Sequence, residues 1–169
     1  ALNVHIPALQ GRGVDVEFAP PLDIPDAGLE AAIRDAIGKP VGDITLADMA
    51  SLTILNANSR DIQDLTGIEH ATNLTELNLD GNQISDIGPL VSLTNLDRLI
   101  LDGNQIIDIG PLSSLTNLNG LFLYNNQIID IGPLSSLTNL EKLWIYNNQI
   151  NDIGPLSSLT NLEKLWIYN

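Results

Sequence analysis

A 22-residue period governs this sequence from residue 52 to its end and limits the folds that it can adopt. The pattern LxxLxLxxNxL opens each repeat. With its first leucine as position 1, full repeats span residues 52–73, 74–95, 96–117, 118–139 and 140–161, and a sixth begins at Leu162. Leucine or isoleucine recurs at positions 1, 4, 6, 11, 14, 17 and 20. One coil cannot cover so many apolar side chains, so they must stack on the coils above and below. The period therefore predicts a right-handed solenoid.

The alternation Leu-x-Leu at positions 4 and 6 has a period of two and predicts a short strand in each repeat. Successive coils bring these strands side by side, about 4.8 Å apart, in one parallel sheet. The expected strands span residues 54–58, 76–80, 98–102, 120–124, 142–146 and, in the incomplete sixth repeat, 164–168.

The N-terminal part of the chain does not follow the repeat. Residues 25–51 are predicted to form a helical cap, which shields the first coil of the solenoid. Helical spacing of Leu29, Ile33 and Ile37 supports this, and Thr45-Leu-Ala-Asp48 resembles a capping box that opens a second short helix.

Residues 1–24 have two interpretations, a flexible leader or a strand around 14–18, where polar and apolar residues alternate. The first full repeat is also irregular, with Arg60 at position 9 and alanines at core positions 57 and 71. We interpret it as a transitional coil against the cap. The solenoid is assigned to residues 52–169.

Two polar ladders run through the repeats. An inward-pointing asparagine at position 9 must have its amide satisfied, and the turning backbone offers unpaired groups, so a structural role is favoured over binding. This ladder comprises Asn82, Asn104, Asn126 and Asn148. The aspartate at position 13 precedes a short turn with proline and suits an N-cap, with a calcium ladder as the less favoured alternative. This second ladder comprises Asp64, Asp86, Asp108, Asp130 and Asp152.

Composition excludes several function classes. The formal net charge of −14 opposes binding to nucleic acid and to anionic membranes, and no run of 18 apolar residues predicts a membrane span. The chain has no cysteine, and its histidines, His5 and His70, lie far apart. With no phosphate-binding loop and no metal-ligand spacing, we expect no enzyme, no metal site and no cofactor.

Six of the chain's seven aromatic residues occupy positions 5 and 7 of the last three repeats. These positions alternate with core positions and must point outward, so we expect an exposed binding patch on one face of the sheet. Its predicted partner-binding residues are Phe122, Tyr124, Trp144, Tyr146, Trp166 and Tyr168, with Arg98, Lys142 and Lys164 at the edge. The alternative is that each ring stacks on its counterpart one coil away and merely braces the sheet.

The phrase IGPLSSLTNLEKLWIYN, followed by NQI, resembles the 22-residue repeats of bacterial internalins and related leucine-rich-repeat proteins. The elements DIxPL and LTNL make the likeness specific, and it covers residues 52–169. The resemblance implies an α/β leucine-rich-repeat solenoid with a concave parallel β-sheet, 3₁₀ turns on the convex side and a helical N-terminal cap. It also implies a secreted or cell-surface bacterial protein that recognises a macromolecule through the concave face.

Three function classes follow. The first is a recognition module for a protein partner. The second is a carbohydrate-binding adhesin, because tryptophan and tyrosine can stack on the glycan rings. The third is a structural or self-assembling repeat protein, because residues 153–169 repeat residues 131–147 letter for letter, as they also would in a consensus-designed repeat scaffold.

The incomplete sixth repeat predicts an uncovered end. We expect fraying after about residue 150 or end-to-end self-association, because the core residues of the fifth repeat lack a full covering coil. These residues are Leu140, Leu143, Ile145, Ile150, Ile153, Leu156 and Leu159.

Overall fold

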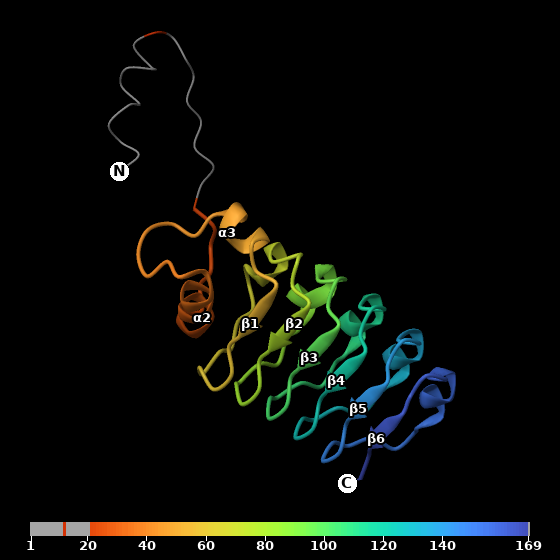
Figure 1. Ribbon diagram of the computed structural model, residues 1–169. Coiled ribbons are helices and arrows are strands. Elements are labelled where there is room, and N and C mark those ends of the chain that lie inside the picture. Colours follow the sequence, from red (N-terminus) through yellow and green to blue (C-terminus); the bar gives the residue numbers. More distant parts are fainter. Residues whose placement is uncertain (1–11, 13–20, 169) are drawn as a thin grey trace.

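The protein, shown here by a computed structural model that describes residues 12 and 21–168, is a helical cap followed by stacked coils (Figure 1). Each coil contributes one strand to a single six-stranded sheet, and the strands follow one another in chain order. They are β1 Ile54–Asn56, β2 Glu76–Asn78, β3 Arg98–Ile100, β4 Gly120–Phe122, β5 Lys142–Trp144 and β6 Lys164–Trp166. The predicted solenoid with a parallel sheet is confirmed.

The sheet keeps the register of the sequence repeat. Leu55 pairs with Leu77, and Leu77 pairs with Leu99, so every partner lies 22 residues away. Each strand is two residues shorter than predicted, but the backbone hydrogen bonds between coils continue past its end. The Ala57 N–H donates to the Asn78 carbonyl, and the Ser59 N–H donates to the Asp80 carbonyl, both at 2.8 Å.

Short 3₁₀ helices occupy the side of each coil opposite the sheet. They are η2 Ile68–His70, η3 Gly88–Ser92, η4 Gly110–Ser114, η5 Gly132–Ser136 and η6 Gly154–Ser158. A proline near the start of η3 to η6 suits the first turn, where its missing N–H costs nothing.

The aspartates at position 13 stabilise these turns, but they are not the N-cap residues, contrary to the prediction. In η3 to η6, each lies one residue before the N-cap. The cap residue of η3 is Ile87, not Asp86. Asp86 Oδ1 instead accepts from the N–H of Gly88, two residues along, at 2.8 Å. The same bond recurs at Asp108, Asp130 and Asp152. These carboxylates are exposed, and no group of three histidine, cysteine, aspartate or glutamate side chains that could hold a metal occurs in the described residues.

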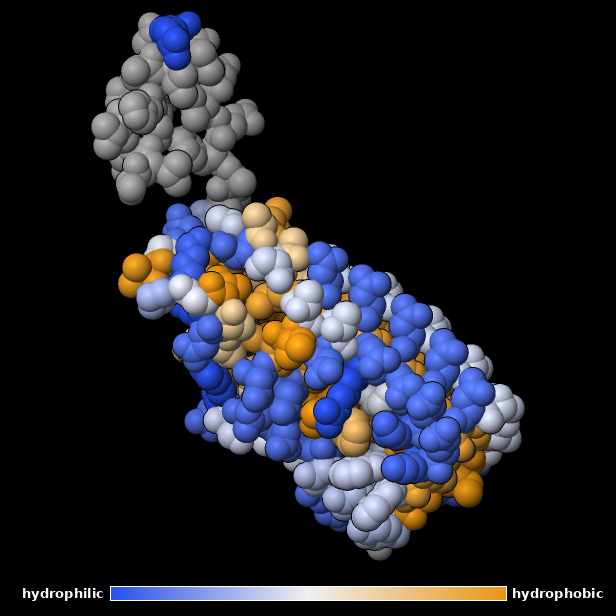
Figure 2. Space-filling model, in the orientation of Figure 1, coloured by the Kyte–Doolittle hydropathy of each residue, from blue (hydrophilic) through white to orange (hydrophobic). Residues whose placement is uncertain are grey.

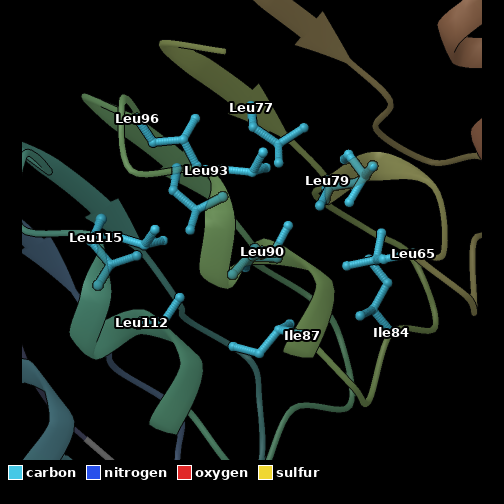
Figure 3. Close-up of a cluster of buried hydrophobic side chains, with 14 of the residues drawn as sticks. Leu65, Leu77, Leu79, Ile84, Ile87, Leu90, Leu93, Leu96, Leu112 and Leu115 are labelled. Carbon is cyan, nitrogen blue, oxygen red and sulfur yellow. The ribbon is translucent and has the colours of Figure 1, made fainter. Parts of the chain in front are cut away.

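The core runs between the sheet and the 3₁₀ helices. In Figure 3, Leu77 and Leu79 from the strand side and Leu90 from η3 point into the same interior space. All three are essentially inaccessible to solvent. Truncating such a leucine to alanine typically costs about 2–5 kcal/mol.

Asparagine side chains cross this core at each turn. Asn104 Oδ1 accepts from the N–H of Ile84 at 3.0 Å, and its Nδ2 donates to the carbonyls of Leu79 and Leu101 at 3.0 and 3.1 Å. Asn82, Asn126 and Asn148 make equivalent bonds. Each amide thus satisfies backbone groups of two neighbouring coils, which would otherwise be buried without partners.

The cap consists of α2 Ala27–Ile37 and α3 Leu46–Ala50. Asp26 caps α2 and also joins it to the first coil. One carboxylate oxygen accepts from the N–H groups of Gly28 and Leu29, and the other accepts from those of Gln63 and Asp64. No described helix is both long enough and apolar enough to span a bilayer.

The helix packs very closely on the coil. A Cβ at Gly28 would lie 2.2 Å from the carbonyl oxygen of Arg60, and the Arg60 guanidinium pairs with Asp35 of α2 at 2.8 Å. Thr45 and Asp48 form the predicted capping box at the start of α3. The strand considered for residues 14–18 lies outside the described residues.

The sixth coil covers part of the fifth, whereas fraying after about residue 150 and end-to-end self-association stay predictions. Leu140, Leu143 and Ile145 are at most 1% exposed, so the short sixth coil covers the strand side of the fifth. On the turn side, Ile153 is 58% exposed and Leu156 is half-buried, and on the strand side of the sixth coil Leu165 is 40% exposed.

Candidate functional site

The outer face of the sheet, called the sheet face below, carries the side chains at positions 3, 5 and 7. It changes character along the solenoid. Figure 2 shows strongly hydrophilic side chains over the middle coils and a paler surface towards the C-terminal coils, whose sheet face is tryptophan and tyrosine. At the N-terminal end, the Asn56 and Asn78 side chains accept from the N–H groups of Asn58 and Asp80, two residues further along the same coils.

The structure brings the six predicted aromatic residues together in two rows, called the aromatic patch below. The position-5 row is Phe122, Trp144 and Trp166. Phe122 meets Trp144 edge-on, with ring centroids 5.0 Å apart and planes at 76°. Trp144 and Trp166 are tilted by 33°, with centroids 5.2 Å apart.

The position-7 row is a stack of tyrosines. Tyr124 and Tyr146 lie 4.8 Å apart with planes 2° from parallel, and Tyr146 and Tyr168 lie 4.8 Å apart at 13°. The parallel register of the strands imposes this spacing, since equivalent residues of adjacent strands are about 4.8 Å apart. The rings therefore do stack on their counterparts, as the bracing alternative required, and their faces are turned towards one another.

Exposure rises along both rows, which corrects the expectation of six exposed rings. Phe122 is only 8% exposed, whereas Trp166 and Tyr168 are 48% and 58% exposed. Trp144, Tyr124 and Tyr146 are half-buried. The surface open to a partner is thus the last two coils together with the edges of the earlier rings.

Phe122 is buried by its neighbours on the sheet face, not by the aliphatic core. Gly120, two residues earlier, has no side chain, and a Cβ there would lie 3.3 Å from Phe122 Cε2. The Arg98 guanidinium lies over the ring, 5.0 Å from its centroid, in a cation–π contact. Position 3 of the fourth repeat, a glycine where other coils carry large side chains, was the sequence signal for this arrangement.

Asp102, at position 7, was not identified from the sequence. It is 4% exposed, and its Oδ1 accepts from the N–H of Tyr124 at 2.9 Å. Burial raises the pKa of its carboxyl to about 7; the Tyr124 N–H bond opposes the rise, the neighbouring Asp80 adds to it and Arg98 opposes it. This carboxyl is therefore partly protonated near neutral pH.

The three predicted cations lie along one register row of the sheet, with Gly120 between Arg98 and Lys142. Arg98 and Lys142 line one hollow of the sheet face with Asp97, Asn119, Gly120 and Phe122. Lys164 follows one strand later, in register with Lys142. Arg98 and Lys164 are exposed, and Lys142 is half-buried.

Comparisons with known proteins point to one family. The sequence profile described as "Leucine Rich repeats (2 copies)" matches residues 72–114, 94–136, 116–158 and 138–169. An internalin from Listeria monocytogenes strain 4b F2365, inlF, has 33% sequence identity and a TM-score of 0.69; the match covers 86% of this chain and 56% of inlF.

A second similar structure is the functional domain of InlJ from Listeria monocytogenes, described as including a cysteine ladder. It has 29% identity and a TM-score of 0.77, and the match covers 85% of this chain and 31% of that one. This chain thus spans about half of the first relative and about a third of the second. No curated protein matches the chain.

Proposed function

Because this chain belongs to the leucine-rich-repeat family, in its internalin-type form, we propose that it is a non-catalytic recognition module that binds a protein partner through the aromatic patch. The observation that supports this most is the exposure of Trp166 and Tyr168, about half of each side chain, at the end of two rows of rings. We further propose that it acts outside the bacterial cell, secreted or on the surface.

The energetics of interfaces favour this use of the patch. Tryptophan, tyrosine and arginine are the residues at which truncation most often costs about 2 kcal/mol or more of binding free energy. The rings project from a rigid sheet and touch their neighbours, so they lose little conformational entropy when a partner binds. Arg98, Lys142 and Lys164 supply the polar rim that such interfaces usually have.

Ring geometry favours a protein partner over a glycan. A sugar stacks on an open aromatic face, but the faces of Tyr124 and Tyr146 lie against other tyrosines, 2° from parallel. Their edges and hydroxyl groups remain for contact, which suits the mixed apolar and hydrogen-bonding surface of a protein. Within the tyrosine row, a glycan would find an open face only at the last coil.

Paired variants test the proposal. Trp144→Ala with Tyr146→Ala should abolish capture of a host-cell protein by the immobilised chain, and Trp166→Ala with Tyr168→Ala should weaken it. Separating one pair of packed rings costs about 0.5–1.5 kcal/mol of stability, so the second double variant, in which each residue has one neighbouring ring, is the milder structural change.

Asn56→Ala with Asn58→Ala is the matched control on the polar end of the same face and should leave capture unchanged. Captured proteins are identified and titrated directly, with circular dichroism to verify folding. Equal capture by the folded aromatic variants would refute the proposal, and binding of a glycan array by the wild type alone would favour the adhesin.

A further inference from the structure

The cations of the sheet face differ from those of the cap in having no ion-pair partner. Three cations of the cap and first coil are paired, as Arg34–Glu30, Lys39–Asp48 and Arg60–Asp35, at 2.7–2.8 Å. Within the described part of the chain, Arg98, Lys142 and Lys164 form no ion pair. The chain has 21 acidic residues against 7 basic ones, so this is not for want of carboxylates.

The strand register concentrates these cations in one row. Arg98 pairs with Gly120, Gly120 with Lys142, and Lys142 with Lys164. Lys142 and Lys164 are directly opposite each other on neighbouring strands, an arrangement that is destabilising for like charges. Arg98 lies two strands from Lys142, and its partner on the other side, on β2, is Glu76. An anion held between Arg98 and Lys142 would therefore meet a cation from β3 and a cation from β5.

Gly120 opens a hollow in the middle of this row. Arg98 and Lys142 stand on either side of it, Asn119 lies beside it, and the ring of Phe122 forms an apolar wall. Among the described residues the Asn119 side chain has no hydrogen-bond partner, while its backbone carbonyl accepts from the N–H groups of Glu141 and Lys142. Asp97 is the one carboxylate of the lining formed by the described residues.

The Arg98 side chain is held ready for a ligand. Its guanidinium carbon lies over the Phe122 ring, 5.0 Å from the centroid, so the ring restricts where the side chain can lie. A guanidinium binds a carboxylate through two parallel N–H bonds, and a side chain already held against a ring loses less entropy when it binds.

We propose that this hollow binds a side-chain carboxylate of the protein partner, between Arg98 and Lys142, and that the partner segment crossing β3 to β6 is acidic. The proposal rests on the proposed function and names the chemistry of its partner. Lys164 would meet the next acidic side chain of that segment. A long polyanion is disfavoured as the ligand. Every part of it that lies outside the hollow would be repelled by the net charge of −14.

Two blocked hexapeptides provide the probe. One alternates leucine with glutamate, and the other alternates leucine with glutamine. In titrations followed by amide ¹H–¹⁵N resonances, the glutamate peptide should shift Arg98, Asn119, Gly120 and Lys142 saturably and bind about tenfold more tightly than the glutamine peptide. Equal affinity of the two peptides, or no shift of these resonances, would overturn the proposal.

Charge variants locate the binding. Arg98→Met and Lys142→Met should each weaken the glutamate peptide several-fold and leave the glutamine peptide unchanged. Arg12→Met, the same change at an exposed cation outside the solenoid, is the matched control and should bind as the wild type does. A similar loss in Arg12→Met would mean diffuse attraction with no site.

A built-in carboxylate gives a second, independent readout. Gly120→Glu places an acidic side chain between the two cations, so it should block the glutamate peptide and melt about 2–4 °C higher than Gly120→Gln. Away from a cationic site, an added negative charge would destabilise a chain that already carries −14. A lower melting temperature for Gly120→Glu than for Gly120→Gln would contradict the proposal.

The two proposals can fail separately. If the aromatic variants lose the captured protein while Arg98→Met and Lys142→Met retain it, the recognition function stands and the acidic-partner proposal falls. If the glutamate peptide binds the hollow but no protein is captured through the aromatic patch, the hollow stands and the recognition function falls.

Discussion

At the scale of single residues, the buried polar groups of this solenoid are satisfied by hydrogen bonds between coils. The Asn126 Nδ2 donates to the carbonyls of Leu101 and Leu123, and its Oδ1 accepts from the Ile106 N–H. An alanine at this place leaves those backbone groups buried and unpaired. The local sequence NN at 125–126 looks like an ordinary polar turn, and only the repeat period distinguishes the inward asparagine from the outward one.

Asn126→Ala should therefore lower the free energy of unfolding by about 1–3 kcal/mol. Asn139→Ala is the matched control, because Asn139, at position 22, is exposed and its side chain donates to the Thr116 carbonyl. The destabilisation of this control should stay below about 1 kcal/mol. Urea unfolding followed by circular dichroism measures both variants. Similar losses of unfolding free energy would show that the buried asparagines stabilise the protein no more than the exposed ones.

Asp102 makes stability depend on pH. Its pKa is raised from 3.8 to about 7, so between about pH 4 and pH 7 the folded chain holds a proton that the unfolded chain releases. Stability should then fall as pH rises through this window, by up to about 1.4 kcal/mol per pH unit, and level off above pH 7.

Asp102→Asn should remove this slope and raise the melting temperature at pH 7, because the amide oxygen can still accept from the Tyr124 N–H. Thermal melts between pH 4 and pH 8 compare it with Asp108→Asn, an exposed aspartate whose loss should leave the slope in place. If the melting temperatures of the wild type and of Asp102→Asn depended on pH in the same way, a buried protonated carboxyl at Asp102 would be excluded.

At the scale of elements, the cap is attached to the solenoid by backbone contact. Alanine at an exposed helix position is favoured over glycine by about 1 kcal/mol. At Gly28 the opposite effect should prevail, because a Cβ would lie 2.2 Å from the Arg60 carbonyl oxygen and would push α2 away from the coil. The four N–H bonds to Asp26, which straddle that junction, would then be strained as well.

Gly28→Ala should accordingly destabilise the protein by about 1–3 kcal/mol, the usual cost of overpacking. Ala31→Gly, at an exposed place on the same helix, should cost about 1 kcal/mol by propensity alone. Denaturant midpoints decide between the two effects: a stabilised Gly28→Ala variant would mean that α2 is not seated on the first coil as described.

At the scale of the whole molecule, a net charge of −14 is spread over a thin, elongated solenoid. Raising the salt concentration from about 10 mM to about 150 mM shortens the Debye length from about 30 Å to about 8 Å and screens this self-repulsion. The melting temperature should rise by a few degrees over this range. Sucrose at equal osmolality is the control, and a melting temperature that is constant or falls with sodium chloride would contradict the expectation.

Much of the fold was predictable because every repeat has the same residue types at the same positions, so each coil folds in the same way. Position 8 illustrates this: Gly81, Gly103, Asn125 and Asn147 all have a φ of +55 to +66°, which glycine and asparagine adopt at least cost. The strand positions, the capping box of α3 and the aromatic rows likewise follow from spacing that is visible in the chain, while the 3₁₀ side was implied by the resemblance to internalins.

The candidate site was less predictable, because exposure on the sheet face depends on residues one coil away. Phe122 and Trp144 occupy the same position of adjacent repeats, yet Phe122 alone is buried, since Gly120 leaves room beneath it and Arg98 covers it. The sequence placed the six rings on one face, but not the order of their exposure.

By itself, then, the sequence determined the coil, its register and the residues that face inward, because these depend on a period that each repeat carries. The tertiary structure decided the close seat of Gly28, the double role of Asp26, the buried carboxyl of Asp102 and the hollow at Gly120. Those features arise where particular side chains of different coils meet, and a period describes what coils share, not where they differ.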